Sequence, residues 1–173
     1  MKEIHEELDN LVVSQKPFAS IQAYGDFIWR MRQLYVAFEP AISKVSHQIG
    51  LPDCSQDCIS AATRDCPNIA PPAAAPELSH LADGIWGYAY VMEGSALGAT
   101  QLVTMAGQQL PDGTSFEFLT IVSSHAKSRW PIFVKEIDNG CEDVNAAIAA
   151  ANQAFQYALE VFTKPIPDCR SSP

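Results

Sequence analysis

Apolar residues recur with the period of an α-helix along nearly the whole chain, and this pattern limits the fold more than any other feature. Between Ser20 and Ile49 they share one helical face at Tyr24, Phe27, Ile28, Met31, Leu34, Tyr35, Phe38 and Ile42. The alternation typical of strands is nearly absent, and residues 116–122 are the one ambiguous run. The sequence therefore predicts an all-α fold, a compact helical bundle in which residues 1–173 form a single domain.

Turn and breaker residues divide this pattern into segments. A first helix carries Ile4, His5, Leu8, Leu11 and Val12 on one face. Further helices are predicted over residues 20–49, 55–65, 77–109, 116–123, 130–138 and 142–163. Because proline removes a backbone donor, Pro40 is expected to kink or divide its helix, and Pro131 to mark a break. Residues 67–76, which include Pro71-Pro72, are predicted to form a surface connection.

Two glycines stand one turn apart inside the predicted helix 77–109. Gly94 and Gly98 each cost a helix about 1 kcal/mol relative to alanine, and no Pro, Asn or Asp beside them suggests a turn. Residues at i and i+4 lie on one helix face. We interpret the pair as a place where something approaches the backbone more closely than a Cβ atom would permit. Another helix or a flat ligand would both meet this requirement.

The charge and the apolar content exclude several classes of partner. A net charge of −9 disfavours nucleic acid and anionic membranes, because their phosphates would be repelled. The sequence contains no stretch of about 18 consecutive apolar residues, so it predicts no membrane span. Residues 1–7 lack the apolar core of a secretory signal. We therefore expect a cytoplasmic protein without a nucleic-acid or membrane partner.

Five cysteines, an odd number without an export signal, do not suggest a disulfide framework. The C-x3-C-x7-C spacing of Cys54, Cys58 and Cys66 is not that of a zinc finger or ribbon. Buried thiols on one helix are the simpler interpretation. The aspartates beside these residues would raise the pKa of the thiols, so a reactive thiolate is disfavoured.

One of the four histidines stands apart from the others. His47, His80 and His125 lie near predicted helix ends or connections, whereas His5 lies on the apolar face of its helix. A lone histidine on such a face is usually a hydrogen-bonded core residue. A flat metal macrocycle between this helix and the glycine-bearing helix is the alternative. The imidazole would supply an axial nitrogen, and the glycines would bring the backbone close to the opposite face.

These two segments resemble the proximal and distal helices of bacterial heme oxygenases. Residues 1–9, MKEIHEELD, look like the proximal helix, and residues 90–98, YVMEGSALG, are similar to the distal signature. Three further matching segments follow in the family's order: residues 112–118, residues 129–138 and the alanine-rich segment that ends at Ala154-Phe155. The stretch from Leu51 to Pro76 matches poorly.

The resemblance implies a single-domain, all-α heme oxygenase-like bundle with heme between a proximal helix and a glycine-kinked distal helix. Heme would be both cofactor and substrate, cleaved to biliverdin, CO and ferrous iron. The reaction would use O2 and electrons from an external donor such as ferredoxin or a flavin reductase. A phytochrome that receives biliverdin is a candidate partner.

The same resemblance implies roles for particular residues. His5 would be the axial ligand of the heme iron, and the distal catalytic residues would be Gly94, Ser95 and Gly98. The heme-binding residues would be Glu93, the possible propionate partners Lys127 and Arg129, and the aromatic walls Phe116 and Phe155. Mammalian-type members carry aspartate where this chain has Ser95, so proton delivery would need ordered water, the backbone or Ser95 itself. A solvated cation and an ordinary core aromatic are the plainer alternatives.

Two other functions remain open at this point. A non-catalytic heme carrier or sensor would keep His5 and could keep both glycines. A helical interaction module would instead pack its Gly94 and Gly98 face against a partner helix. The sequence leaves the biliverdin isomer, the electron donor and the physiological purpose, iron acquisition or chromophore supply, undetermined.

Overall fold

The computed structural model describes residues 2–67 and 84–166, and within these ranges the chain is helical without a strand. The helices are α1 (Lys2–Ser14), α2 (Ile21–Gln48), α3 (Ser55–Asp65), α4 (Gly84–Ala96), α5 (Ala99–Gln109), α6 (Glu117–Gly140) and α7 (Val144–Thr163). The predicted all-α fold is confirmed. His80, Cys169, most of the predicted connection 67–76 and the predicted helix start at residue 77 lie outside the described residues.

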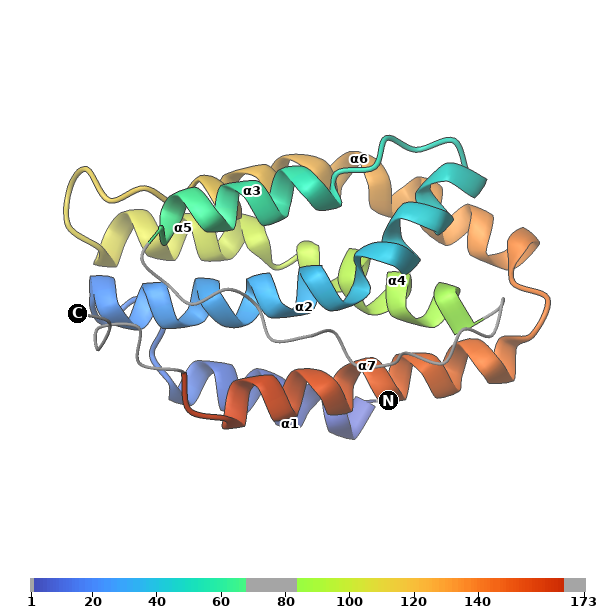
Figure 1. Ribbon diagram of the computed structural model, residues 1–173, viewed down its shortest axis with the longest axis horizontal. Coiled ribbons are helices and arrows are strands. Elements are labelled where there is room, and N and C mark those ends of the chain that lie inside the picture. The colour runs from blue at the N-terminus through green and yellow to red at the C-terminus, as the bar shows by residue number, and fades with distance from the viewer. Residues whose placement is uncertain (1, 68–83, 167–173) are drawn as a thin grey trace, which may run out of the picture.

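The helices form a bundle around α2 and α4. In Figure 1, α1 and α7 make up one side, α3 and α6 lie on the opposite side, and α2 runs between them. Helix α4 packs against α7, α2 and α6, while α1 packs against α7 and α5 packs against α6. The core is rich in aromatic rings, among them Phe38 and Tyr88, which stack with their centroids 5.5 Å apart. No described helix is both long enough and apolar enough to cross a membrane.

Local signals set most of the helix ends. Ser20 caps α2, since its side chain accepts a hydrogen bond from the Ala23 amide at 3.0 Å. Asp143 caps α7 in the same way through the Ala146 amide at 2.9 Å. Helix α2 gives way to a turn at Gly50, which adopts a φ of +67° that other residues rarely take. The predicted helix over residues 55–65 coincides with α3.

The prediction that Pro131 separates two helices was wrong, because α6 continues through it from Glu117 to Gly140. Proline in a helix interior costs about 3 kcal/mol. Buried side chains lie on both sides of it, namely Arg129 at 4% exposed and Phe133 at 1%, and their packing offsets that cost. Pro40 likewise lies inside α2 and does not divide it.

The prediction of one continuous helix up to residue 109 was wrong, because the helix is interrupted. Helix α4 ends at Ala96, α5 begins at Ala99, and Leu97 and Gly98 form the α4–α5 junction between them. The amides of Leu97 and Gly98 donate to carbonyls three residues back, at 3.2 Å each, so the end of α4 tightens before the chain turns into α5. The interruption thus falls at one of the two glycines singled out in the sequence.

Candidate functional site

His5 lies on α1 with more than half of its side chain exposed, at 54%. Its Nδ1 atom lies 3.1 Å from the Oδ2 atom of Asp9, one turn further along the helix. Its ring meets Phe155 of α7 edge-on, with the centroids 5.4 Å apart. The alternative that His5 is a core histidine is wrong, because its side chain is exposed. A carboxylate at Nδ1 favours a proton on that nitrogen and leaves the Nε2 lone pair as an acceptor.

Gly94 and Gly98 lie at the end of α4 and in the α4–α5 junction. A Cβ atom added to Gly94 would lie 3.6 Å from the nearest atom of the Trp130 ring, an ordinary contact distance. A Cβ atom added to Gly98 would meet only the Ser95 carbonyl oxygen, at 3.5 Å. Gly98 adopts φ −68° and ψ −20°, which any residue can take. Neither glycine therefore marks a close helix–helix approach among the described residues.

Ser95 is exposed beside these glycines. Its hydroxyl donates to the carbonyl oxygen of Met92, three residues earlier in the same helix, at 2.9 Å. The oxygen of Ser95 keeps its acceptor positions for a water molecule or a ligand. Leu97 in the junction is also exposed, at 45%. The junction thus presents a small, mostly backbone surface with one hydroxyl.

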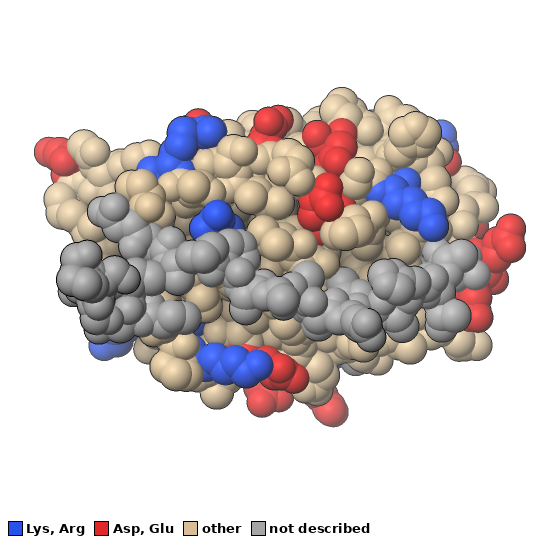
Figure 2. All heavy atoms as spheres, viewed as in Figure 1, with Lys and Arg blue, Asp and Glu red and all other residues tan. Residues whose placement is uncertain are grey.

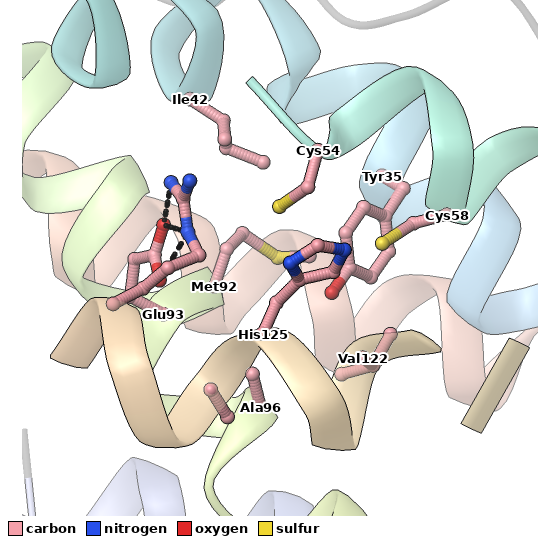
Figure 3. Close-up of a pocket in the computed structure, with 11 residues that line it drawn as sticks. Tyr35, Ile42, Cys54, Cys58, Met92, Glu93, Ala96, Val122 and His125 are labelled. Atoms are coloured by element: carbon pink, nitrogen blue, oxygen red, sulfur yellow. Dashed lines mark hydrogen bonds and ion pairs between the residues drawn. The ribbon is translucent and has the colours of Figure 1, made fainter. Parts of the chain in front are cut away.

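Glu93 and Arg129 bind each other inside the bundle. The guanidinium donates from Nε to both carboxylate oxygens, at 3.0 and 3.2 Å, and the two residues are 6% and 4% exposed. Arg129 also donates to the Ser46 hydroxyl at 2.8 Å and to the Pro52 carbonyl oxygen. Both residues line a cavity of about 20 Å³, whose lining includes neither His5 nor the two glycines. Figure 3 labels Glu93 at this cavity.

This environment corrects the expectation that Glu93 and Arg129 bind heme. Burial alone would lower the pKa of Arg129, but its hydrogen bonds to Glu93 and that carboxylate's charge hold the pKa above its usual value. The guanidinium stays charged, and its donors already have partners in the protein. The pair joins α4 to α6 and to the segment between α2 and α3, so its role in this structure is to hold these elements together.

The remaining predicted heme-binding residues lie in three different environments. Phe155 is 6% exposed and contacts His5, as described above. Phe116 precedes α6, is half-buried and lies against α5, 3.9 Å from the position of a Cβ atom on Gly107. Lys127 is exposed on α6. The structure thus brings His5 and Phe155 together, while Glu93 and Arg129 form a separate buried pair.

The sequence analysis missed Asp9 as a partner of His5. The signal was present, because a carboxylate four residues after a histidine in a helix lies on the same face. It also missed Ser46 and Pro52 as partners of Arg129. No sequence pattern links these residues, which the chain brings together over 83 and 77 positions.

The chain resembles a solved structure along nearly its whole length. The heme oxygenase from Neisseria meningitidis, solved with NO and with CO bound, superimposes with a TM-score of 0.74 at 24% sequence identity. The match covers 93% of this chain and 85% of that one. The chain has the heme oxygenase fold. No protein-family model and no curated protein sequence matches it.

The heme oxygenase fold accounts for the arrangement of helices. The predicted fold class is confirmed, because the all-helical bundle and the neighbour superimpose over most of both chains. At this level of identity the likeness concerns the fold. The chemistry must be argued from the residues of this chain.

Proposed function

We propose that this chain binds heme between α1 and the α4–α5 junction and degrades it as a heme oxygenase. The products would be biliverdin, CO and ferrous iron, formed with O2 and externally supplied electrons. The single observation that carries the proposal is the free space beside Gly98. The neighbour of the same fold is a heme oxygenase, which supports the assignment by analogy.

The presence of glycine at a helix end usually has one of three explanations. It adopts a positive φ, it lets another part of the chain approach, or it makes room for a ligand. Gly98 has a φ of −68°, so the first reason fails. Within the described part of the chain, only its own helical turn would contact an added Cβ atom, so the second fails as well. A ligand is the reason that remains, and the exposed junction gives such a ligand access.

The proximal side suits a metal macrocycle. His5 is accessible, and its bond to Asp9 leaves Nε2 for an iron atom. The Phe155 ring lies edge-on to the imidazole and limits its rotation. These features match a porphyrin with one protein nitrogen as its axial ligand.

The two helices proposed to face heme are also incompletely covered by the protein. Helix α1 has no buried residue, although Ile4, Leu8 and Leu11 pack partly against the core. Only Ala99 and Ala106 are buried in α5, whereas Leu102 and Met105 are half-buried. A porphyrin between these helices would remove further apolar surface from water, which favours binding by about 25 cal/mol per Å².

The chain's own residues would then hold and orient the substrate. Bound heme would supply a redox-active iron together with the porphyrin ring to be opened. His5 would fix one face, and the backbone at Gly94 and Gly98 would limit space on the other face. The Ser95 hydroxyl can hold a water molecule there as a route for protons. We retain Lys127, exposed on α6, as the candidate propionate partner, and Arg129 is not part of this site.

The electron donor would need a specific docking surface. On the described part of the face in Figure 2, lysine and arginine side chains are scattered and acidic ones lie between them. The chain carries a net charge of −9, so it offers no general attraction to an acidic ferredoxin. We propose ferredoxin or a flavin reductase as the donor. A phytochrome is the proposed recipient of biliverdin.

Hemin titration tests the binding half of the proposal. Adding hemin to the chain should produce a Soret band, and His5→Ala should weaken binding and shift the band because the axial nitrogen is lost. His47→Ala is the matched control, since this histidine is exposed on α2 and should leave the spectrum unchanged. An unaltered spectrum in His5→Ala would refute the axial-ligand assignment.

Turnover tests the catalytic half. Ascorbate, or ferredoxin with its reductase, is added to the hemin complex, and CO release and bilin absorbance are followed. A Soret band that decays with both products supports the oxygenase. A persistent band without CO indicates a heme carrier or sensor instead. Failure to bind hemin, together with a larger assembly in light scattering, indicates an interaction module.

A further inference from the structure

Two cysteines lie together in the interior, at a cavity whose lining includes neither His5 nor Gly98. Cys54 precedes α3 and Cys58 lies one turn into it, and both line the cavity of about 20 Å³ that also borders Arg129. Figure 3 shows Cys54, Cys58, Tyr35 and His125 around this cavity. Cys54 is 8% exposed and Cys58 is 1% exposed. Both are free thiols.

The side chains of Tyr35, Cys54 and Cys58 line this one cavity together with the buried guanidinium of Arg129. The neighbouring Cys58 thiol and the positive charge of Arg129 lower the pKa of the Cys54 thiol against the opposing effects of burial, Glu93 and Asp53. The Cys54 thiol and burial raise the pKa of Cys58.

This finding corrects the expectation that neighbouring aspartates would disfavour a thiolate here. Asp53 does raise the pKa of Cys54, but more weakly than the Cys58 thiol and Arg129 lower it. The carboxylate of Asp53 is turned to the α3 N-terminus, where it accepts from the Ser55 amide at 2.9 Å and the Ser55 hydroxyl at 2.6 Å. Arg129 comes from α6, so its influence was not visible in the local sequence.

We propose that Cys54 and Cys58 form an oxidisable dithiol, in which Cys54 reacts with hydrogen peroxide and Cys58 completes a reversible disulfide. The Cys54 thiolate attacks one peroxide oxygen, the O–O bond breaks, and the departing hydroxide takes up a proton as water. The Cys58 sulfur then attacks the sulfur of the Cys54 sulfenic acid, an S–S bond forms as the S–O bond breaks, and the departing hydroxide takes up the Cys58 proton as a second water. The two thiols lose two protons and two electrons, and one peroxide is reduced to two waters.

The backbone around Cys54 allows this closure with a local change. The Cys58 amide donates to the Cys54 carbonyl at 3.0 Å, so the pair spans one helical turn. Cβ atoms at this spacing are about 5–6 Å apart, whereas a disulfide requires about 3.5–4.5 Å. Cys54 lies outside the helix proper and follows the non-helical Pro52 and Asp53. Moving Cys54 would loosen the first turn of α3, and a strained bond of this kind is readily reduced.

Peptide mapping of the full-length chain tests the proposal directly. The reduced chain is exposed to hydrogen peroxide, alkylated and digested with trypsin. Cleavage after Lys44 and Arg64 yields a peptide, residues 45–64, that contains Cys54 and Cys58 but no other cysteine. This peptide should lose two hydrogens in mass, resist alkylation and regain both thiols on reduction. It should react at least about tenfold faster than Cys66, whose pKa is raised to about 12 by burial.

Serine variants separate the two roles. Cys58→Ser should leave a sulfenic acid on Cys54 that dimedone traps, and Cys54→Ser should abolish the fast reaction of the peptide. Cys66→Ser is the matched control and should form the disulfide at the unaltered rate. Oxidation of Cys54 no faster than that of Cys66 in the unaltered chain would overturn the proposal, whether or not a variant folds. So would fast oxidation of Cys58 in Cys54→Ser.

Discussion

Gly87 lies in the first turn of α4 and Gly98 follows the end of that helix, and the two glycines have different surroundings. A Cβ atom on Gly87 would lie 2.0 Å from the Ala147 carbonyl oxygen and 2.7 Å from the Ala151 amide nitrogen, so the α4 and α7 backbones are in direct contact there. At Gly98 an added Cβ atom would meet, among residues 2–67 and 84–166, only its own helical turn. One glycine serves helix packing, and the other leaves space open. Glycine is therefore present at these two positions for two unrelated reasons.

The end of α4 near Gly98 is held in another way, because no backbone from another described helix packs closely against this glycine. Glu93 precedes Gly94 and provides this fixation through its buried ion pair with Arg129 of α6. Packing thus holds one end of α4, and a charged hydrogen-bonded pair holds the other. Substitutions can disrupt the packing at Gly87 and the Glu93–Arg129 pair separately.

The largest effect is expected from Arg129→Met. This substitution leaves the Glu93 carboxylate buried without its partner, which costs about 3–5 kcal/mol. Urea unfolding followed by circular dichroism measures the loss. The double substitution Glu93→Gln with Arg129→Met should recover part of it, because both charges are then removed. A loss below about 1 kcal/mol in the single variant would show that the pair does not hold this end of the helix.

Gly87→Ala should have the next largest effect. Its methyl group would overlap the α7 backbone, so the two helices must separate, at a cost of about 3 kcal/mol. Gly107→Ala is the matched control. Gly107 lies in α5, and its nearest neighbour would be 3.9 Å from the new Cβ atom. The control should gain about 0.5–1 kcal/mol from helix propensity. Equal unfolding midpoints for the two variants would contradict the packing assignment.

Gly98→Ala should separate stability from ligand binding. The backbone conformation accepts alanine and the space is open, so the free energy of unfolding should change by less than about 1 kcal/mol. If heme occupies this space, the methyl group should weaken hemin binding about tenfold, measured by titration of the Soret band. The His47→Ala variant, altered at an exposed position of α2, serves as the control and should bind hemin normally. Unchanged affinity in Gly98→Ala would remove the main support for the proposed site.

The features that the sequence predicted depend on neighbouring residues. The predicted bounds of α3 match the structure. The caps at Ser20 and Asp143 were not predicted, although they, like the turn at Gly50, also follow from residues within a few positions. The N-terminus of α6 does not, because Asp65 caps it by accepting from the Glu117 and Phe118 amides at 3.1 and 2.9 Å. That contact exists only once α3 has packed against α6. The continuity of α6 through Pro131 depends on packing in the same way.

The same distinction between local signals and tertiary packing applies to the residues of the candidate site. His5, Gly94 and Gly98 were identified from their helical spacing and from a motif, and both signals are local. Arg129 was misassigned, because a cation beside Trp130 has the same sequence signal whether it faces solvent or a buried carboxylate. Only the packing of α4 against α6 pairs it with Glu93. The lowered pKa of Cys54 was missed for the same reason.

Asp9→Asn should have the smallest effect on the folded chain and a selective effect on the proximal side. The His5–Asp9 pair is exposed, with side chains 54% and 65% accessible, so its loss should leave the unfolding midpoint unchanged. The neutral amide would no longer favour the proton on Nδ1, and hemin affinity should fall about tenfold. Glu7→Gln removes the same charge from an exposed position of α1 and controls for general electrostatics. If both variants weaken hemin binding equally, Asp9 contributes only charge. If Asp9→Asn alone does so, the carboxylate orients the His5 imidazole for heme binding.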